Sequence, residues 1–116
     1  MNKQEMWYFH HREVFMEINK EYDLESTLTI NVKKYLNTQT DVYYFKASER
    51  YIKGVSDILC CCSGIFVAIE LKAKNNEASQ QQIRFIEKIV SSGGVGGICK
   101  SIKDVQGLLS KAREKI

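Results

Sequence analysis

The spacing of apolar residues predicts blocks of helix and strand along the chain. Apolar residues at helical intervals predict helices over 1–22 and 24–36, from Ser79 to the Gly93-Gly94 pair, and from Ser101 onward. Runs rich in β-forming residues predict strands over residues 41–47, 55–62, 64–72 and 95–100. Asp23 is the expected N-cap of the second helix, and Ser101 of the last. The order α-α-β-β-β-α-β-α predicts an α/β (α+β) fold.

Residues 54–74 form the most unusual stretch, two apolar strands joined by a turn at Ser63-Gly64. Side chains two apart on a strand point to the same face, so Glu70 and Lys72 share one face. If the strands pair antiparallel, Asp57 meets Glu70 across them. A charged cluster among apolar neighbours is costly unless it is paired or holds a metal. The hairpin is therefore the candidate site.

The three charged residues suggest phosphodiester chemistry. Two close carboxylates repel each other unless a cation lies between them. Mg²⁺ prefers oxygen ligands, and Asp57, Glu70 and the backbone carbonyl of Leu71 would supply them. A metal held there would activate water, while Lys72 would orient that water or neutralise charge on the phosphate. The alternative is that Glu70 and Lys72 form a solvated ion pair, contributing about 0–1 kcal/mol.

Composition narrows the class of protein. The chain of 116 residues is 44% hydrophobic and 27% charged, which fits one globular domain. A net charge of +3 is compatible with a nucleic-acid partner without requiring one. The cysteines contain no C-x-x-C pair, which favours buried free thiols over a zinc site: Cys60, Cys61, Cys62 and Cys99. The start of the chain does not read as a signal peptide, and apolar runs of strand length predict an intracellular protein without a membrane span.

Three segments in order resemble the VRR-NUC family of the PD-(D/E)XK nuclease superfamily, in particular its small stand-alone phage or bacterial members. They are GVSDIL at 54–59, GIFVAIELKAK at 64–74 and SQQQ at 79–82. The resemblance covers about residues 25–100. Ser56 departs from it, because the superfamily often has proline there, and residues 1–22 match nothing in it.

The resemblance implies a restriction-endonuclease-like αβββαβ core with a mixed central sheet flanked by helices. Residues 1–116 would form a single nuclease domain. Within it, 1–22 would be a helical extension, 23–100 the core and 101–116 a C-terminal helix.

The resemblance also implies roles for single residues. Asp57 and Glu70 would bind Mg²⁺, for which Mn²⁺ would substitute, and Lys72 would be the catalytic lysine. Gln82 matches a glutamine near the site, although Ser79-x-x-Gln82 is also a capping box. An acid on the preceding helix would contribute as well; Glu25 is the first choice, and Glu21 is the alternative.

The implied activity is a divalent-metal-dependent DNA endonuclease that acts as a homodimer on branched DNA such as Holliday junctions. Two alternatives remain open: a non-catalytic DNA-binding or assembly module on the same fold, and a nuclease for linear or flap DNA. Phosphate contacts position DNA without reading its sequence. They are expected from basic residues near the site: Lys74, Arg84, Lys53, Arg50 and Lys100.

Overall fold

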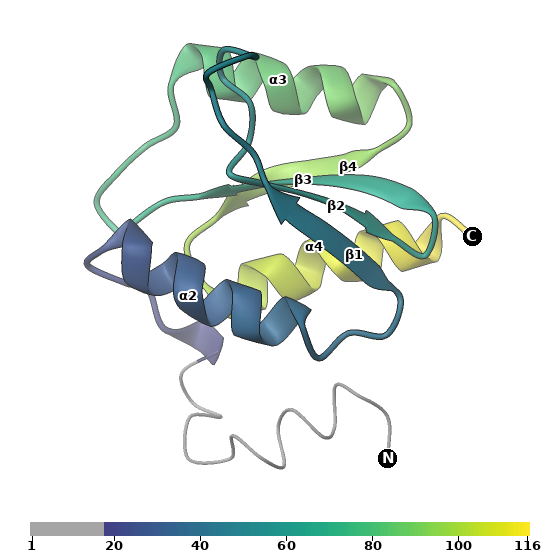
Figure 1. Cartoon of the computed structure of the whole chain (residues 1–116), viewed down its shortest axis with the longest axis horizontal. Coiled ribbons are helices and arrows are strands. Elements are labelled where there is room, and N and C mark those ends of the chain that lie inside the picture. The colour runs from purple at the N-terminus through teal and green to yellow at the C-terminus, as the bar shows by residue number, and fades with distance from the viewer. Residues whose placement is uncertain (1–17) are drawn as a thin grey trace.

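Four strands form one sheet with helices on both faces in the computed structural model, which describes residues 18–116 (Figure 1). The sheet order is β1-β2-β3-β4, with β1–β3 antiparallel and β4 parallel to β3. The strands are β1 (Val42–Lys46), β2 (Ile58–Cys62), β3 (Ile65–Leu71) and β4 (Val95–Cys99). The helices are α2 (Glu25–Leu36), α3 (Gln80–Ser91) and α4 (Ile102–Glu114). The predicted αβββαβ order, followed by a C-terminal helix, is confirmed.

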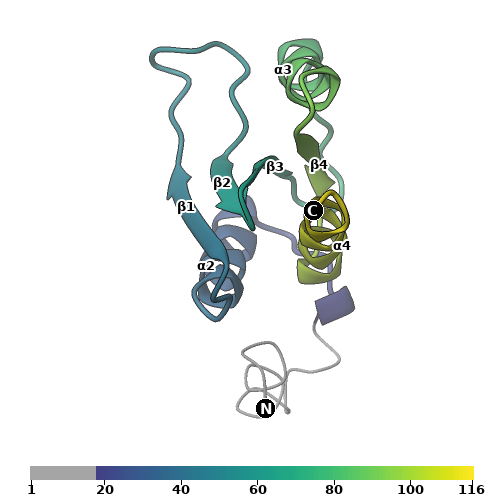
Figure 2. The same ribbon diagram turned by 90° about the vertical axis from the view of Figure 1, so that its right-hand side faces the viewer.

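The main core lies between the sheet and the pair α2 and α4 (Figure 2). Alternate residues of β3 point into it, and each helix adds one apolar stripe. Its fully buried members include Leu28, Val32, Leu36, Val67, Ile69, Leu71, Val105 and Leu109. This core packs against one face of β3. The side chains on the other face of the strand are therefore available for a site.

Helix α3 covers the opposite face only in part. Phe85 and Ile89 pack on a small cluster formed by Val55, Leu59 and Ala68. None of the residues of α3 is fully buried, although its predicted apolar stripe faces the sheet. The face of the sheet beside α3 therefore keeps exposed apolar side chains.

The predicted boundaries of α3 and α4 are confirmed by their caps. Ser79 accepts a hydrogen bond from the Gln82 N–H, and Gly93, with φ +100°, follows the helix in the left-handed conformation that favours glycine. Ser101 accepts from the Asp104 N–H at the start of α4. Local side-chain chemistry determines where these helices begin and end.

Two predictions near the N-terminus are wrong. Asp23 does not cap α2, because Leu24 occupies that position and the Asp23 carboxylate pairs with Lys74 at 2.9 Å. The helix predicted over 1–22 does not reach Tyr22, which is buried and whose carbonyl accepts a hydrogen bond from the Lys74 N–H. Residues 1–17 of that predicted helix lie outside the described residues.

The cysteines follow the alternation of β2. Cys60, Cys62 and Cys99 are buried, whereas Cys61 is exposed, which corrects the prediction of four buried thiols. Alternation along β2 places Cys61 on the face opposite the main core, where it is exposed. Burial raises the pKa of Cys60 to about 12, so this thiol stays protonated at neutral pH.

Among residues 18–116, none of the helices combines the length and the apolar character that a membrane span requires.

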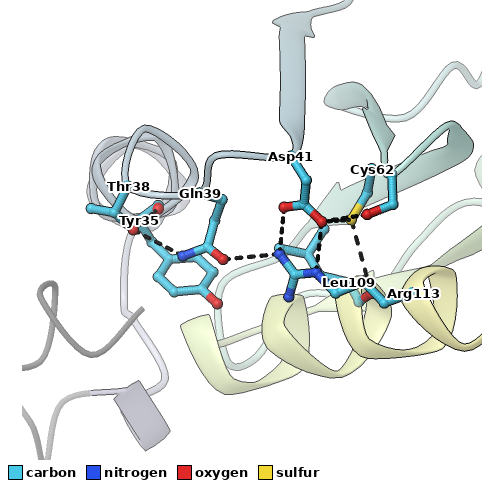
Figure 3. A network of polar contacts seen from close by, with 8 residues as sticks. Tyr35, Thr38, Gln39, Asp41, Cys62, Leu109 and Arg113 are labelled. Carbon is cyan, nitrogen blue, oxygen red and sulfur yellow. Dashed lines mark hydrogen bonds and ion pairs between the residues drawn. The ribbon is translucent and has the colours of Figure 1, made fainter. Parts of the chain in front are cut away.

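A polar network fastens the end of the sheet at which β1 and β3 begin (Figure 3). The Arg113 guanidinium donates to both carboxylate oxygens of Asp41, at 2.9 and 2.8 Å, and to Gln39 Oε1 at 3.0 Å. The Ser63 hydroxyl also donates to Asp41. This cluster, called the Asp41 clamp below, joins β1, the β2–β3 turn and the last turn of α4.

Candidate active site

Asp57 lies directly before β2, and hydrogen bonds hold both its main-chain carbonyl and its side-chain carboxylate. Its carbonyl accepts a hydrogen bond from the Ala47 N–H at 2.9 Å, and its carboxylate accepts one from the Leu71 N–H at 2.7 Å. Because Ile58 pairs with Ile69, the next position along the hairpin places Asp57 opposite Glu70. This register agrees with the prediction that Asp57 and Glu70 lie opposite each other across the hairpin.

The loop that carries Asp57 is fixed against α3 through Gly54. This glycine has φ +76°, and a Cβ added to it would lie 2.4 Å from the carbonyl oxygen of Gln81. Real Cβ atoms do not approach backbone so closely, so only glycine fits. The contact aligns the residues before Asp57 with the first turn of α3.

Glu70 is buried without hydrogen-bond donors. It is 1% exposed, and neither carboxylate oxygen accepts a hydrogen bond from the described residues. The pKa of Glu70 is raised to about 8, first by burial and then by the neighbouring Asp57 carboxylate, while Lys72 acts in the opposite direction. Burial of a carboxylate that accepts no hydrogen bond is unfavourable for folding, and the only ion-pair partner of Glu70 within residues 18–116 is Lys72, so Glu70 is a candidate ligand for a further cation.

Lys72 lies between two carboxylates. Its ammonium is 3.5 Å from Glu70 Oε2 and 3.7 Å from Glu25 Oε1, and its side chain is 13% exposed. Glu25 comes from the first turn of α2 and also accepts a hydrogen bond from Asn76 at 3.3 Å. The structure thus brings Glu25 to the cluster through Lys72. Glu21 is instead among the acids that raise the pKa of Lys74, after Asp23.

Gln82 serves as a helix cap in this structure. Its Oε1 accepts a hydrogen bond from the Ser79 N–H at 2.9 Å, and its own N–H donates to Ser79 Oγ at 3.2 Å. This reciprocal pair is the capping box, the local interpretation of the sequence. A role for Gln82 in the site stays a prediction.

The oxygen ligands available fit a hard divalent ion. Within residues 18–116, no group of three His, Cys, Asp or Glu side chains could hold a metal, so the acidic ligands would be Asp57 and Glu70 alone. Mg²⁺ commonly binds through one or two carboxylates and keeps several waters. The Glu70 oxygens, which accept no hydrogen bond from the described residues, agree with such an ion, whereas the Leu71 carbonyl stays a predicted ligand.

The predicted basic residues fall into two groups. Lys100 donates a hydrogen bond to the Lys74 carbonyl at 2.7 Å, so these two lie together beyond the ends of β3 and β4. Lys53 lies on the β1–β2 loop, across a pocket from Arg84 of α3, and Arg50 lies on the same loop. Lys88 also lines that pocket but was not among the predicted basic residues. Its position four residues after Arg84 places both side chains on one face of a helix, which could have indicated it.

The fold is shared with a known type of domain. A solved structure described as a VRR_NUC domain matches with a TM-score of 0.62 and 22% sequence identity, and the match covers 74% of this chain and 94% of that chain. No family model matches the sequence, and no curated protein matches it either. The chain therefore has the nuclease-like fold of a VRR_NUC domain, as its sequence pattern predicted.

Proposed function

We propose that this protein is a metal-dependent nuclease that hydrolyses phosphodiester bonds in DNA. The carrying observation is Glu70, a fully buried carboxylate without hydrogen-bond donors, beside Asp57 and Lys72. A buried ion pair such as Lys72–Glu70 often stabilises a fold no more than well-packed apolar residues would, so stability alone does not account for this cluster. The nuclease-like fold adds support.

Asp57 and Glu70 would hold the Mg²⁺ or Mn²⁺ ion, with the Leu71 carbonyl beside them. When bound, the ion polarises the phosphodiester and lowers the pKa of its water. The Leu71 N–H holds the Asp57 carboxylate in place at 2.7 Å. Glu25 and Glu70 hold the Lys72 ammonium, which orients the attacking water or neutralises charge that develops on the phosphate.

The proposed substrate is branched DNA such as a Holliday junction, and the proposed assembly is a homodimer. A two-fold dimer would present two sites to two symmetric strands. The support for both is the resemblance to small stand-alone VRR-NUC nucleases, carried by Asp57, Glu70-x-Lys72 and the glycine before them.

The test is cleavage of labelled junction, flap and linear duplex DNA with Mg²⁺, with Mn²⁺ and with EDTA. Asp57→Asn and Lys72→Met should each slow cleavage by at least about 100-fold, because each removes transition-state stabilisation. Glu87→Gln and Lys103→Met, exposed residues of α3 and α4, are the matched controls and should cleave normally.

Two results would contradict the proposal. One is cleavage that persists in both site variants. The other is DNA binding without cutting on every substrate, which would favour the non-catalytic DNA-binding module instead.

A further inference from the structure

A pocket of about 370 Å³ lies between the β1–β2 loop and α3. Figure 2 shows the loop and the helix standing side by side on the same side of the sheet. The residues that line the pocket come from both elements: Ile52, Lys53, Gln81, Arg84, Phe85, Lys88 and Ile89. It is called the loop–α3 pocket below.

The loop–α3 pocket combines an apolar wall with unpaired cations. Phe85 and Ile89 form the wall and are anchored in the small cluster under α3. Lys53, Arg84 and Lys88 surround it, and no ion pair within residues 18–116 involves any of them. None of the seven lining residues is acidic. These residues favour a ligand that carries negative charge and also has a flat or apolar part.

The loop beside the pocket presents an exposed aromatic ring. Tyr51 is 85% exposed and Ile52 is 54% exposed, and the Arg50 guanidinium lies 5.9 Å from the Tyr51 ring centroid. Proteins that bind single-stranded nucleic acid use this combination, in which bases stack on aromatic rings and cations hold the phosphates. Paired duplex hides the faces of its bases, so contacts to it are made mainly by polar and cationic groups.

We propose that Tyr51 and the loop–α3 pocket bind an unpaired nucleotide of the DNA substrate. The base contacts Tyr51, Ile52 and the apolar wall, and the neighbouring phosphates contact Lys53, Arg84 and Lys88. The inference rests on the proposed nuclease function and narrows its substrate class from branched DNA in general to branched DNA with unpaired bases close to the cleaved bond, such as forks and flaps.

The position of the pocket relative to the candidate active site supports this. Lys53 and Asp57 are four residues apart, a length of chain that spans at most about 14 Å. One DNA strand rises 3.4 Å per nucleotide, so both sites lie within about four nucleotides of one strand. The Gly54–Gln81 contact lies between them and fixes their separation.

The test compares the affinity for a fluorescein-labelled fork with a single-stranded arm and for a duplex of the same length, in metal-free buffer. The double variant Tyr51→Ala, Ile52→Ala should bind the fork about tenfold more weakly and the duplex almost unchanged. Tyr43→Ala and Ile30→Ala, at 75% and 56% exposure, are matched controls away from the pocket and should bind both DNAs normally. Arg84→Gln should weaken binding to both and reduce the salt slope by about 0.9.

A 2-aminopurine base in the single-stranded arm gives a second readout. Its fluorescence should change on binding wild-type protein and not on binding the double variant. Equal losses of affinity on fork and duplex, or no loss on either, would overturn the proposal. The two proposals can be contradicted separately. Fork binding that depends on Tyr51, without any cleavage, would contradict only the proposed nuclease function. Cleavage that is unchanged by substitution of Tyr51 and Ile52 would contradict only the proposed nucleotide-binding role of the pocket.

Discussion

The two ends of the sheet hold acidic clusters with opposite energetics. At one end Asp41, 31% exposed, accepts hydrogen bonds from Arg113 and Ser63, and the Arg113 bond holds its pKa well below the usual range. At the other end Glu70, only 1% exposed, accepts none, and burial raises its pKa. Hydrogen bonds to the charged form stabilise a carboxylate, whereas burial without them does the reverse.

The difference distinguishes Asp41, a carboxylate that stabilises the fold, from Glu70, a carboxylate that is proposed to bind a metal ion. The Asp41 clamp joins three elements and leaves its charges satisfied. The Glu70 cluster keeps two acids close together with one lysine near Glu70, which lowers stability unless a cation is bound. Natural proteins accept such local cost where a site needs it. Four measurements would sharpen or break this comparison.

The largest effect on stability is expected from Asp41→Asn, which should lower the free energy of unfolding by about 2–3 kcal/mol at pH 7. Because folding lowers the pKa of Asp41 below its usual 3.8, its contribution is present above that pH and is lost as the pH falls through the folded value. Urea denaturation at pH 7 and pH 3 should therefore show the gap from wild type shrinking in acid. A constant gap would mean that Asp41 acts through shape and not charge.

Glu70→Gln should have the opposite sign and stabilise the metal-free protein by about 1–2 kcal/mol at pH 8.5. The folded pKa of Glu70, about 8, lies above its usual 4.5, so wild type loses stability as the pH rises between these values. The advantage of the variant should vanish below pH 4.5 in the same denaturation experiment. Destabilisation at pH 8.5 would show that the Glu70 carboxylate is satisfied after all.

Mg²⁺ should stabilise wild type and leave Glu70→Gln almost unchanged. An ion that binds only the folded state adds about 1.4 kcal/mol at ten times its Kd. Thermal unfolding with increasing Mg²⁺ measures this, with Asp41→Asn as the control that should keep the full response. An equal response in Glu70→Gln would place the ion elsewhere.

Gln82→Ala should have the smallest effect, a loss of about 0.5–1 kcal/mol from the capping box. Gln82→Glu keeps a capping acceptor and should restore that stability. Chemical denaturation combined with a cleavage assay separates the two roles of this residue. If both variants lose cleavage while Gln82→Glu is fully stable, Gln82 belongs to the site as well as to the cap.

The parts of the site that could be predicted are those set by local periodicity. Alternation along β3 placed Glu70 and Lys72 on one face, and hairpin register placed Asp57 across from them. The αβββαβ order followed from the same patterns, because strand and helix periods differ.

What could not be predicted depends on contacts between distant segments. Arg113 reaches Asp41 over 72 residues, and neither residue carries a local signal of the pairing. Asp23 has the chemistry of an N-cap, yet the more distant Lys74 takes its carboxylate. The loop–α3 pocket exists only because the loop folds against α3, and no pattern within the loop itself specifies that packing.

The Gly54–Gln81 contact has a consequence for anyone who would transplant this site or engineer it. Gly54 lies there against the carbonyl group and the Cβ of Gln81, so the separation between Asp57 and the start of α3 depends on position 54 having no side chain. A chain that kept Asp57, Glu70 and Lys72 but carried a side chain at position 54 would have every reactive group and the wrong spacing. Substitution scans should therefore find Gly54 as intolerant as the acids, although it has no functional group of its own.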